Sequence, residues 1–179
     1  MAIIATDILL RLATTAGSAG NSLTQADPNA SLGKYISTTD LTTALHGLFD
    51  IVSGAENAAS DIEYRCVFVL NNHATLTLEN AVVYLSAEVA GGCVAAIAVD
   101  STAISAKGAA GVQALTIANE STAPAAISFS APTTAGTGLA LGSIPAGSVK
   151  AFWVRRTAAN TVAVDADGAT FGISGDTAA

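Results

Sequence analysis

The sequence predicts a mainly β protein in which antiparallel strands pack as a β-sandwich. Hydrophobic residues make up 51% of the 179-residue chain, and many of them are Ala and Val, which suit closely packed strand layers better than thick helix bundles. Gly and Thr are frequent and Lys is scarce, a composition typical of strands and turns. Short alternating runs separated by Gly, Pro and Asn give a third indication, because such regular punctuation characterises sandwiches and barrels.

Residues 1–37 are predicted to form an extended N-terminal arm. Residues 1–15 suit a strand or a short amphipathic helix, whereas residues 16–36 are rich in Gly, Ser and Asn. Such a stretch would be an uncommonly long loop in a compact domain. A disordered linker is one interpretation, and an arm ordered by a neighbouring subunit is the other. The candidate partner-binding residues of this arm are Leu23, Asp27, Pro28, Asn29, Leu32, Tyr35 and Ile36.

One short helix is predicted within residues 38–60, which are expected to comprise a helix and a connector. Thr39 or Asp40 is a suitable N-cap, and Gly54 lies where a helix C-cap is expected. Between them, apolar residues recur at helical spacing: Leu41, Leu45, Leu48, Phe49 and Val52. We therefore expect a helix over residues 40–53.

Residues 61–179 are predicted to form the sandwich domain, of an Ig-like or jelly-roll-like kind. In residues 61–72 (DIEYRCVFVLNN) one alternating face is apolar throughout and the other becomes apolar halfway, which predicts a strand covered on both sides. Residues 148–156 (SVKAFWVRR) alternate similarly, and the preceding SIPAGS is predicted to turn a corner between two sheets. The predicted core residues are Tyr64, Cys66, Phe68 and Trp153. Further strands are expected at residues 75–78, 81–89, 93–100, 112–118, 126–130, 139–144 and 170–174.

The charge of the chain argues against nucleic acid as a partner. The formal net charge is −7, so the surface offers no broad positive field to a phosphate backbone. Arg155 and Arg156 form the only adjacent basic pair. We interpret this pair as a solvated strand end or as one side of an ion pair with a partner carboxylate.

The apolar run at residues 81–99 is long enough to resemble a membrane span, but Glu88 and a glycine pair interrupt it. Two strands joined by a glycine turn explain this run better, so no membrane partner is expected. Cys66 and Cys93 are too few for a disulfide scaffold. Whether these two cysteines pair with each other stays open.

Residues suited to catalysis or metal binding are few. His46 and His73 have no Cys, His or Glu at the spacing of a metal site. Residues 165–168 (DADG) match the first half of a calcium loop but lack its later oxygen ligands and closing Glu, and a turn explains them as well. The chain also has no Gly-x-Ser-x-Gly elbow. We expect no enzymatic activity, no cofactor and no metal.

Three stretches resemble a family of small structural proteins of tailed bacteriophages. They are residues 26–37 (ADPNASLGKYIS), 48–72 (LFDIVSGAENAASDIEYRCVFVLNN) and 141–157 (LGSIPAGSVKAFWVRRT), about a third of the chain. The shared features are an asparagine/serine arm, an LFD-type helix end, a Tyr-Arg-Cys strand and a Gly-to-Trp-x-Arg-Arg strand. Lys34 departs from the pattern, because a second glycine is expected there.

The resemblance implies a virion component, assembled in the host cytoplasm, that decorates or cements the phage head. Its expected partners are the major capsid protein and copies of itself, as a homo-oligomer. A neck or tail subunit is the alternative within the same class. A carbohydrate-binding or adhesin-like surface module is the alternative from another class, and it would need an exposed aromatic platform.

Overall fold

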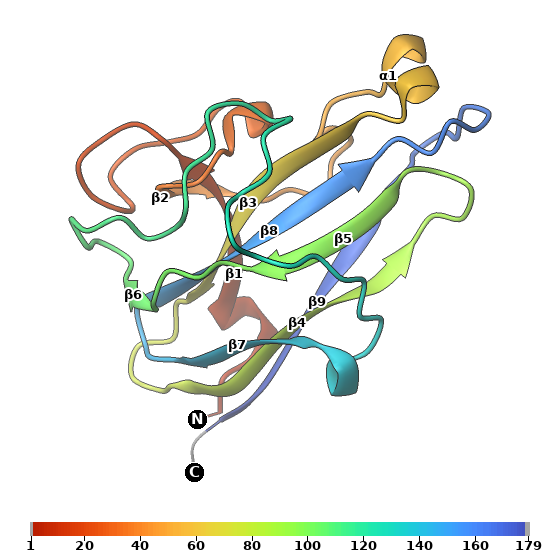
Figure 1. Cartoon of the computed structure of the whole chain (residues 1–179). Coiled ribbons are helices and arrows are strands. Elements are labelled where there is room, and N and C mark those ends of the chain that lie inside the picture. Colours follow the sequence, from red (N-terminus) through yellow and green to blue (C-terminus); the bar gives the residue numbers. More distant parts are fainter. Residues whose placement is uncertain (1, 178–179) are drawn as a thin grey trace.

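The computed structural model describes residues 2–177 and shows a mainly β protein made of two antiparallel sheets (Figure 1). The strands are β1 (Ile8–Thr14), β2 (Tyr35–Asp40), β3 (Ile62–Asn71), β4 (Leu78–Glu88), β5 (Val94–Val99), β6 (Ser105–Ala106), β7 (Leu139–Ile144), β8 (Ser148–Thr157) and β9 (Ala169–Thr177). A six-stranded sheet has the order β2-β1-β3-β8-β5, with β6 beside β8, and a three-stranded sheet has the order β7-β4-β9. Short 3-10 turns lie at Ala5–Asp7, Pro28–Ala30 and Ala135–Thr137, and a helix, α1, at Gly54–Ala59.

Strand β3 is the interior strand that the alternating sequence predicted. It pairs with β1 on one side and β8 on the other. Cys66 and Phe68 point to one face of the large sheet, Val67 and Val69 point to the other, and all four are fully buried. The prediction of a strand covered on both sides is therefore confirmed.

Each face of the large sheet carries its own apolar core. The inter-sheet core joins β3, β5 and β8 to the small sheet, with Phe152 and Val83 among its members. The second core lies on the opposite face, around Phe68 and Trp153, and residues from loops cover it, including Ile117 and Phe129. Two cores in so short a chain explain why small apolar residues dominate its composition, because both strand faces must pack closely.

The predicted core residues divide into three that are fully buried and one that is not. Cys66, Phe68 and Trp153 are fully buried in the second core, as predicted. Tyr64 is only half-buried at the margin of that core, where its ring centre lies 5.4 Å from that of Phe129. The second core therefore ends near Tyr64 on the large sheet.

The predicted connections between strands are present. Residues 145–147 link β7 of the small sheet to β8 of the large one, so SIPAGS does turn the expected corner. A glycine-containing turn also joins β4 to β5 within residues 81–99, and these strands again belong to different sheets. In the part of the chain that the structure describes, no helix is long and apolar enough to cross a membrane.

The extended N-terminal arm predicted for residues 1–37 is not present. Strand β1 lies inside the large sheet between β2 and β3, and the polar segment after it folds back on the same sheet (Figure 1). The backbone N–H of Asn21 donates to the Ile36 carbonyl (2.7 Å), and that of Thr38 donates to the Leu23 carbonyl (2.9 Å). The segment lacks core-forming side chains, but its backbone groups satisfy the outer edge of β2.

The polar segment is also fixed by Ser31, which is fully buried. Its hydroxyl accepts the backbone N–H of Ala13 (2.8 Å) and donates to the Cys66 carbonyl (2.6 Å), and so bridges β1 and β3. Gly33 and Lys34 then turn the chain into β2 with positive φ angles of 92° and 76°. Glycine adopts such a left-handed backbone more readily than Lys34 does.

The helix predicted over residues 40–53 is absent, and α1 lies where a connector was expected. The hydroxyl of Ser53 accepts the backbone N–H of Glu56 (3.2 Å), while the Glu56 carboxylate accepts the backbone N–H of Ser53 (2.6 Å). This capping box starts a helix at Gly54, the residue that had been expected to end one.

Three of the further predicted strands are not formed as expected. Residues 112–118 and 126–130 are loops that cover the large sheet, with single bridges from Thr116 to Gly33 and from Ser130 to Ile97. Of residues 75–78, only the last belongs to a strand, β4. Alternating apolar residues here serve to cover a core rather than to pair in a ladder.

Candidate functional site

Three of the predicted partner-binding residues are used within the chain itself. Tyr35 and Ile36 are buried in β2, and Leu32 packs against the second core. The Tyr35 hydroxyl also donates to the Ala110 carbonyl at 3.1 Å. Their apolar surface is therefore occupied by the chain's own core.

The other four predicted residues lie in the loop between β1 and β2. Asp27 accepts the backbone N–H of Asn29 (2.9 Å) at the start of the turn that Pro28 opens. The Asn29 side-chain oxygen accepts a hydrogen bond from Arg65 (2.8 Å). Leu23 is the only one of the seven with an exposed large apolar side chain. A role in partner binding stays a prediction for all seven residues.

A network of charged residues, which we call the arginine cluster, lies where β3 begins and β8 ends. Its members are Asp50, Glu63, Arg65, Glu120 and Arg156. Arg65 is fully buried and its guanidinium pairs with Glu120 at 2.5 Å. Arg156 pairs with Glu63 and, at 3.2 Å, with Asp50. Both arginine side chains are largely buried. Removing one partner of these ion pairs would therefore leave a buried charge without compensation.

Phe49 connects the arginine cluster to the irregular segment before α1. Its ring lies between the guanidinium groups of Arg65 and Arg156, at 5.0 and 4.8 Å. Burial raises the pKa of Glu63 above its ordinary value, although the neighbouring Arg156 opposes that rise. The cluster thus fastens residues 41–53 onto the sheet.

The basic pair of β8 is largely not a solvated strand end. The Arg156 side chain is only 12% exposed and pairs with carboxylates of its own chain. The Arg155 guanidinium lies 5.5 Å from the ring centre of Phe129, and its Nε has no hydrogen-bond partner within residues 2–177. Intramolecular pairing therefore replaces the partner carboxylate that was considered for Arg156.

A second buried polar group surrounds Asp100. Its carboxylate accepts hydrogen bonds from Trp153 Nε1 (2.7 Å) and from the backbone N–H groups of Thr102 (2.7 Å) and Leu115 (2.9 Å). Lys150 Nζ donates to the Asp100 and Thr102 carbonyls, and burial lowers the pKa of Lys150. All these bonds stay within the chain and attach a covering loop to β8, which is a structural role.

The cysteines and the DADG turn offer no metal site. Across residues 2–177, no group of three or more His, Cys, Asp or Glu side chains is arranged to hold a metal ion. Asp167 accepts the backbone N–H of Cys93 at 2.6 Å, and burial raises the Cys93 pKa to about 11. Cys66 and Cys93 are both free, so the bridge that the sequence left open is not formed.

Exposed apolar side chains gather at one end of the molecule, which we call the α1 end. They are Ile51, Ile62, Val89, Val94 and Val162. The loops that carry them meet there: Asn57 Nδ2 of α1 donates to the Thr161 carbonyl (2.7 Å), and the Thr161 hydroxyl donates to the Gly91 carbonyl (3.0 Å). Figure 1 shows α1, the β4–β5 turn and the loop after β8 at the same end.

Two of these side chains lie in one row across the large sheet. Ile62 and Val94 both pair with Thr157, from opposite sides of β8. The loops that cover the second core stop short of this row, so both side chains are exposed. An apolar row left uncovered on an otherwise covered sheet is typical of a surface that meets another molecule.

The α1 end is acidic as well as apolar. Asp61, Glu88 and Asp165 are exposed there and form no ion pair within the described residues. Two nearby arginines, Arg65 and Arg156, are directed into the arginine cluster. The surface therefore combines an apolar centre with a negatively charged rim, a pattern that fits a partner with basic residues around an apolar patch.

Within residues 2–177 no Trp, Tyr or Phe side chain is exposed, so the described surface carries no aromatic platform of the kind that a carbohydrate-binding module needs. Trp153, the single tryptophan of the chain, is fully buried, and Tyr64 is half-buried against Phe129.

No family model, no curated protein and no solved structure matches this chain.

Proposed function

We propose that this chain is a non-enzymatic structural protein of a tailed-bacteriophage virion that decorates the head by binding the major capsid protein. We also propose that the two sheets form an Ig-like or jelly-roll-like sandwich. The α1 end is the main support, because it offers an apolar surface with a charged rim, while the buried charged groups are engaged in holding the fold together. Assembly takes place in the host cytoplasm, and a neck or tail position is the alternative location.

The α1 end is suited to bind a protein surface that is already formed. Ile62 and Val94 project from β3 and β5, which both pair with β8. Ile51 belongs to the segment that Phe49 and the arginine cluster fasten to the large sheet. A surface held in this way loses little conformational freedom on binding. The partner should present Lys or Arg opposite the exposed carboxylates and apolar side chains opposite the centre.

Replacing Ile51 and Val162 together by serine should weaken binding to phage heads at least about tenfold, because each buried apolar side chain contributes on the order of 1 kcal/mol. The two side chains are 75% and 85% exposed, so the fold should be unaffected. Co-sedimentation with heads that lack the chain measures the affinity. Val112→Ser is the matched control, because Val112 is 54% exposed in the loop after β6. β6 pairs with the start of β8, and Figure 1 shows α1 at the opposite end of β8. Equal binding by the double variant would rule out the α1 end.

The location of the chain tests the function itself. We expect antibodies against the chain to label particles of the virus that encodes it over the whole shell, as seen by electron microscopy. Labelling at a single vertex would replace decoration by a neck or tail role. Particles without any label, from preparations in which the chain is absent by mass spectrometry, would refute a virion role altogether.

A further inference from the structure

Strand β9 is a nine-residue sheet edge with one bare side. It pairs with β4 along one side, and no backbone–backbone hydrogen bond within residues 2–177 reaches its other side. The Ile3 backbone N–H donates to the Thr177 hydroxyl (3.3 Å), at the last residue of the strand. Both register irregularities of this pair add a residue to β4, so β9 itself runs without interruption. A long regular edge of this kind is ready to pair with a further strand.

The other free edges within the described residues are covered by the chain's own loops or, in β7, interrupted by a bulge. The outer edge of β5 is bonded to Ser130 in both directions at Ile97 (2.8 and 2.9 Å), and the segment around Leu23 covers β2. The part of β3 beyond β1 receives the Ser31 and Glu120 carbonyls. β7 is interrupted by a bulge near Gly142, which has a φ of 86°.

The composition of β9 also lacks the usual protection of a sheet edge. Its sequence ATFGISGDT has no proline, lysine or arginine, and Asp176 is its single charged residue. Lys, Pro and bulges are the devices by which edges usually avoid pairing. Within the described residues, β9 is the single edge that is both bare and regular, and it has none of these devices. This indicates that β9 pairs with a further strand.

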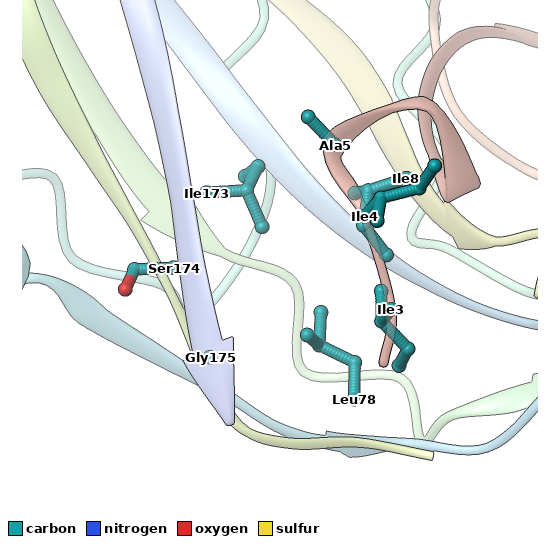
Figure 2. A pocket seen from close by; sticks show the side chains of 8 residues that line it. All are labelled: Ile3, Ile4, Ala5, Ile8, Leu78, Ile173, Ser174 and Gly175. Carbon is teal, nitrogen blue, oxygen red and sulfur yellow. The ribbon is translucent and has the colours of Figure 1, made fainter. Parts of the chain in front are cut away.

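A shallow groove of about 220 Å³, lined mainly by isoleucine and leucine side chains, runs beside this edge. Figure 2 shows Ile173 of β9 on one side of the groove, Ile4 and Ile8 on the other, and Leu78 between them. Ile4 is 62% exposed on the rim. The groove keeps the N-terminal segment away from the middle of β9, and no charged side chain lines it.

We propose that β9 of a second copy of this chain pairs antiparallel with β9, with Ile173 on the two-fold axis, so that two small sheets become one continuous sheet. Closed two-fold symmetry requires a surface that is complementary to itself. In this register Phe171 lies opposite Gly175, so its ring meets no side chain across the new pair. Thr170 lies opposite Asp176, so no two like charges face each other.

The second copy is the occupant that the chemistry of the edge favours. A strand of the same sequence supplies backbone partners along the whole edge, and its symmetry-related groove meets this one with Ile4 on each rim. The groove has no charge to attract a charged partner. The inference concerns the chain in solution and is independent of the proposed place in a virion.

Sedimentation equilibrium of the purified full chain should show a reversible monomer–dimer equilibrium in the micromolar range. Thr170→Asp should weaken the dimer roughly fivefold, because it places a carboxylate opposite Asp176 at two symmetry-related positions. Thr170→Lys should strengthen the dimer by a similar factor. Thr170 is exposed, so neither change should disturb the monomer.

The double variant Thr170→Asp with Asp176→Lys places opposite charges across the pair, as Thr170→Lys does, and should therefore dimerise at least as tightly as the wild type. Thr24→Asp, on the exposed segment along β2 in the other sheet, makes the same change of charge away from β9 and should leave the equilibrium unchanged. A chain that stays monomeric at millimolar concentration would overturn the inference. A dimer that responds equally to Thr170→Asp, Thr170→Lys and Thr24→Asp would also overturn it.

Discussion

Replacing Trp153 by alanine is expected to lower the free energy of unfolding by about 4 kcal/mol, because the indole fills the centre of the second core. The side chain is fully buried and packs with Phe68, Cys66 and loop residues such as Ile117. Its removal also takes one donor from the buried carboxylate of Asp100. The remaining hydrogen bonds to that carboxylate do not replace the lost packing, so the cavity is expected to dominate the loss of stability.

Urea unfolding followed by circular dichroism measures this effect, since the variant has lost the chain's single tryptophan and its fluorescence. Trp153→Phe keeps most of the apolar volume but not the donor to Asp100. It should therefore lose less stability than the alanine variant, about 2 kcal/mol. A loss below about 1 kcal/mol for the alanine variant would mean that the second core is not packed as described.

Replacing Arg156 by methionine is expected to cost about 3 kcal/mol, because it leaves the buried carboxylate of Glu63 without its closest cation. The variant also loses the contacts of Arg156 with Asp50 and with the Phe49 ring. The segment before α1 should consequently exchange its amide hydrogens faster than in the wild type. Asp40, whose side chain is 57% exposed in its pair with Arg11, supplies the control. Asp40→Asn should cost less than about 1 kcal/mol, because Arg11 keeps its hydrogen bond to Asn21.

The destabilisation caused by Arg156→Met should depend on pH in a defined direction. Burial raises the pKa of Glu63 above its ordinary value of 4.5, so the folded state binds a proton more readily than the unfolded chain does. Stability from this group is present below that ordinary value and is lost as the pH rises through the folded-state pKa. Without Arg156 the pKa should rise further, because the guanidinium opposes the effect of burial.

Denaturant unfolding of wild type and variant at about pH 7 and about pH 4.5 tests this coupling. The difference in unfolding free energy between them should be smaller at the acidic pH, where the Glu63 carboxyl accepts a proton in the variant. The double variant Arg156→Met with Glu63→Gln should recover part of the loss at neutral pH. A pH-independent difference would show that packing around Phe49, rather than the ion pair, is responsible.

The interior strands were predictable because their side chains alternate. In the middle of β3 and β8 most side chains face one of two cores, so the pattern in the sequence reflects the environment directly. The arm was not predictable in this way. Residues 16–34 are held by backbone groups and by Ser31, and hydrogen bonds of that kind leave no periodic trace among the side chains.

The helix over residues 40–53 failed for a different reason. Leu41, Leu48 and Phe49 pack against the inter-sheet core, but from an irregular segment, so apolar spacing alone was ambiguous. The Ser53–Glu56 capping box did carry a usable signal for the start of α1. Local hydrogen-bonding patterns were therefore more reliable here than hydrophobic periodicity.

The candidate site could be predicted even less. The apolar residues of the α1 end come from four separate parts of the sequence and only meet through the strand order. The alternating pattern put Arg65 on the same face as Glu63, but its partners Asn29 and Glu120 lie on distant loops. Tertiary pairing decides such groupings, and a single sequence does not encode it in any local pattern.

The pairing of β3 with β8 determines how the chain must reach its native state. Ile62 pairs with Thr157 and Leu70 with Val149, so each contact joins positions that the ribosome synthesises far apart. Folding should accordingly be slow, because long loops must close before the central ladder forms. Until β8 emerges, β3 exposes apolar side chains on both faces and resembles an aggregation-prone segment. Chains truncated before β8 should therefore accumulate as insoluble material, and chaperones should associate with the nascent protein during this interval.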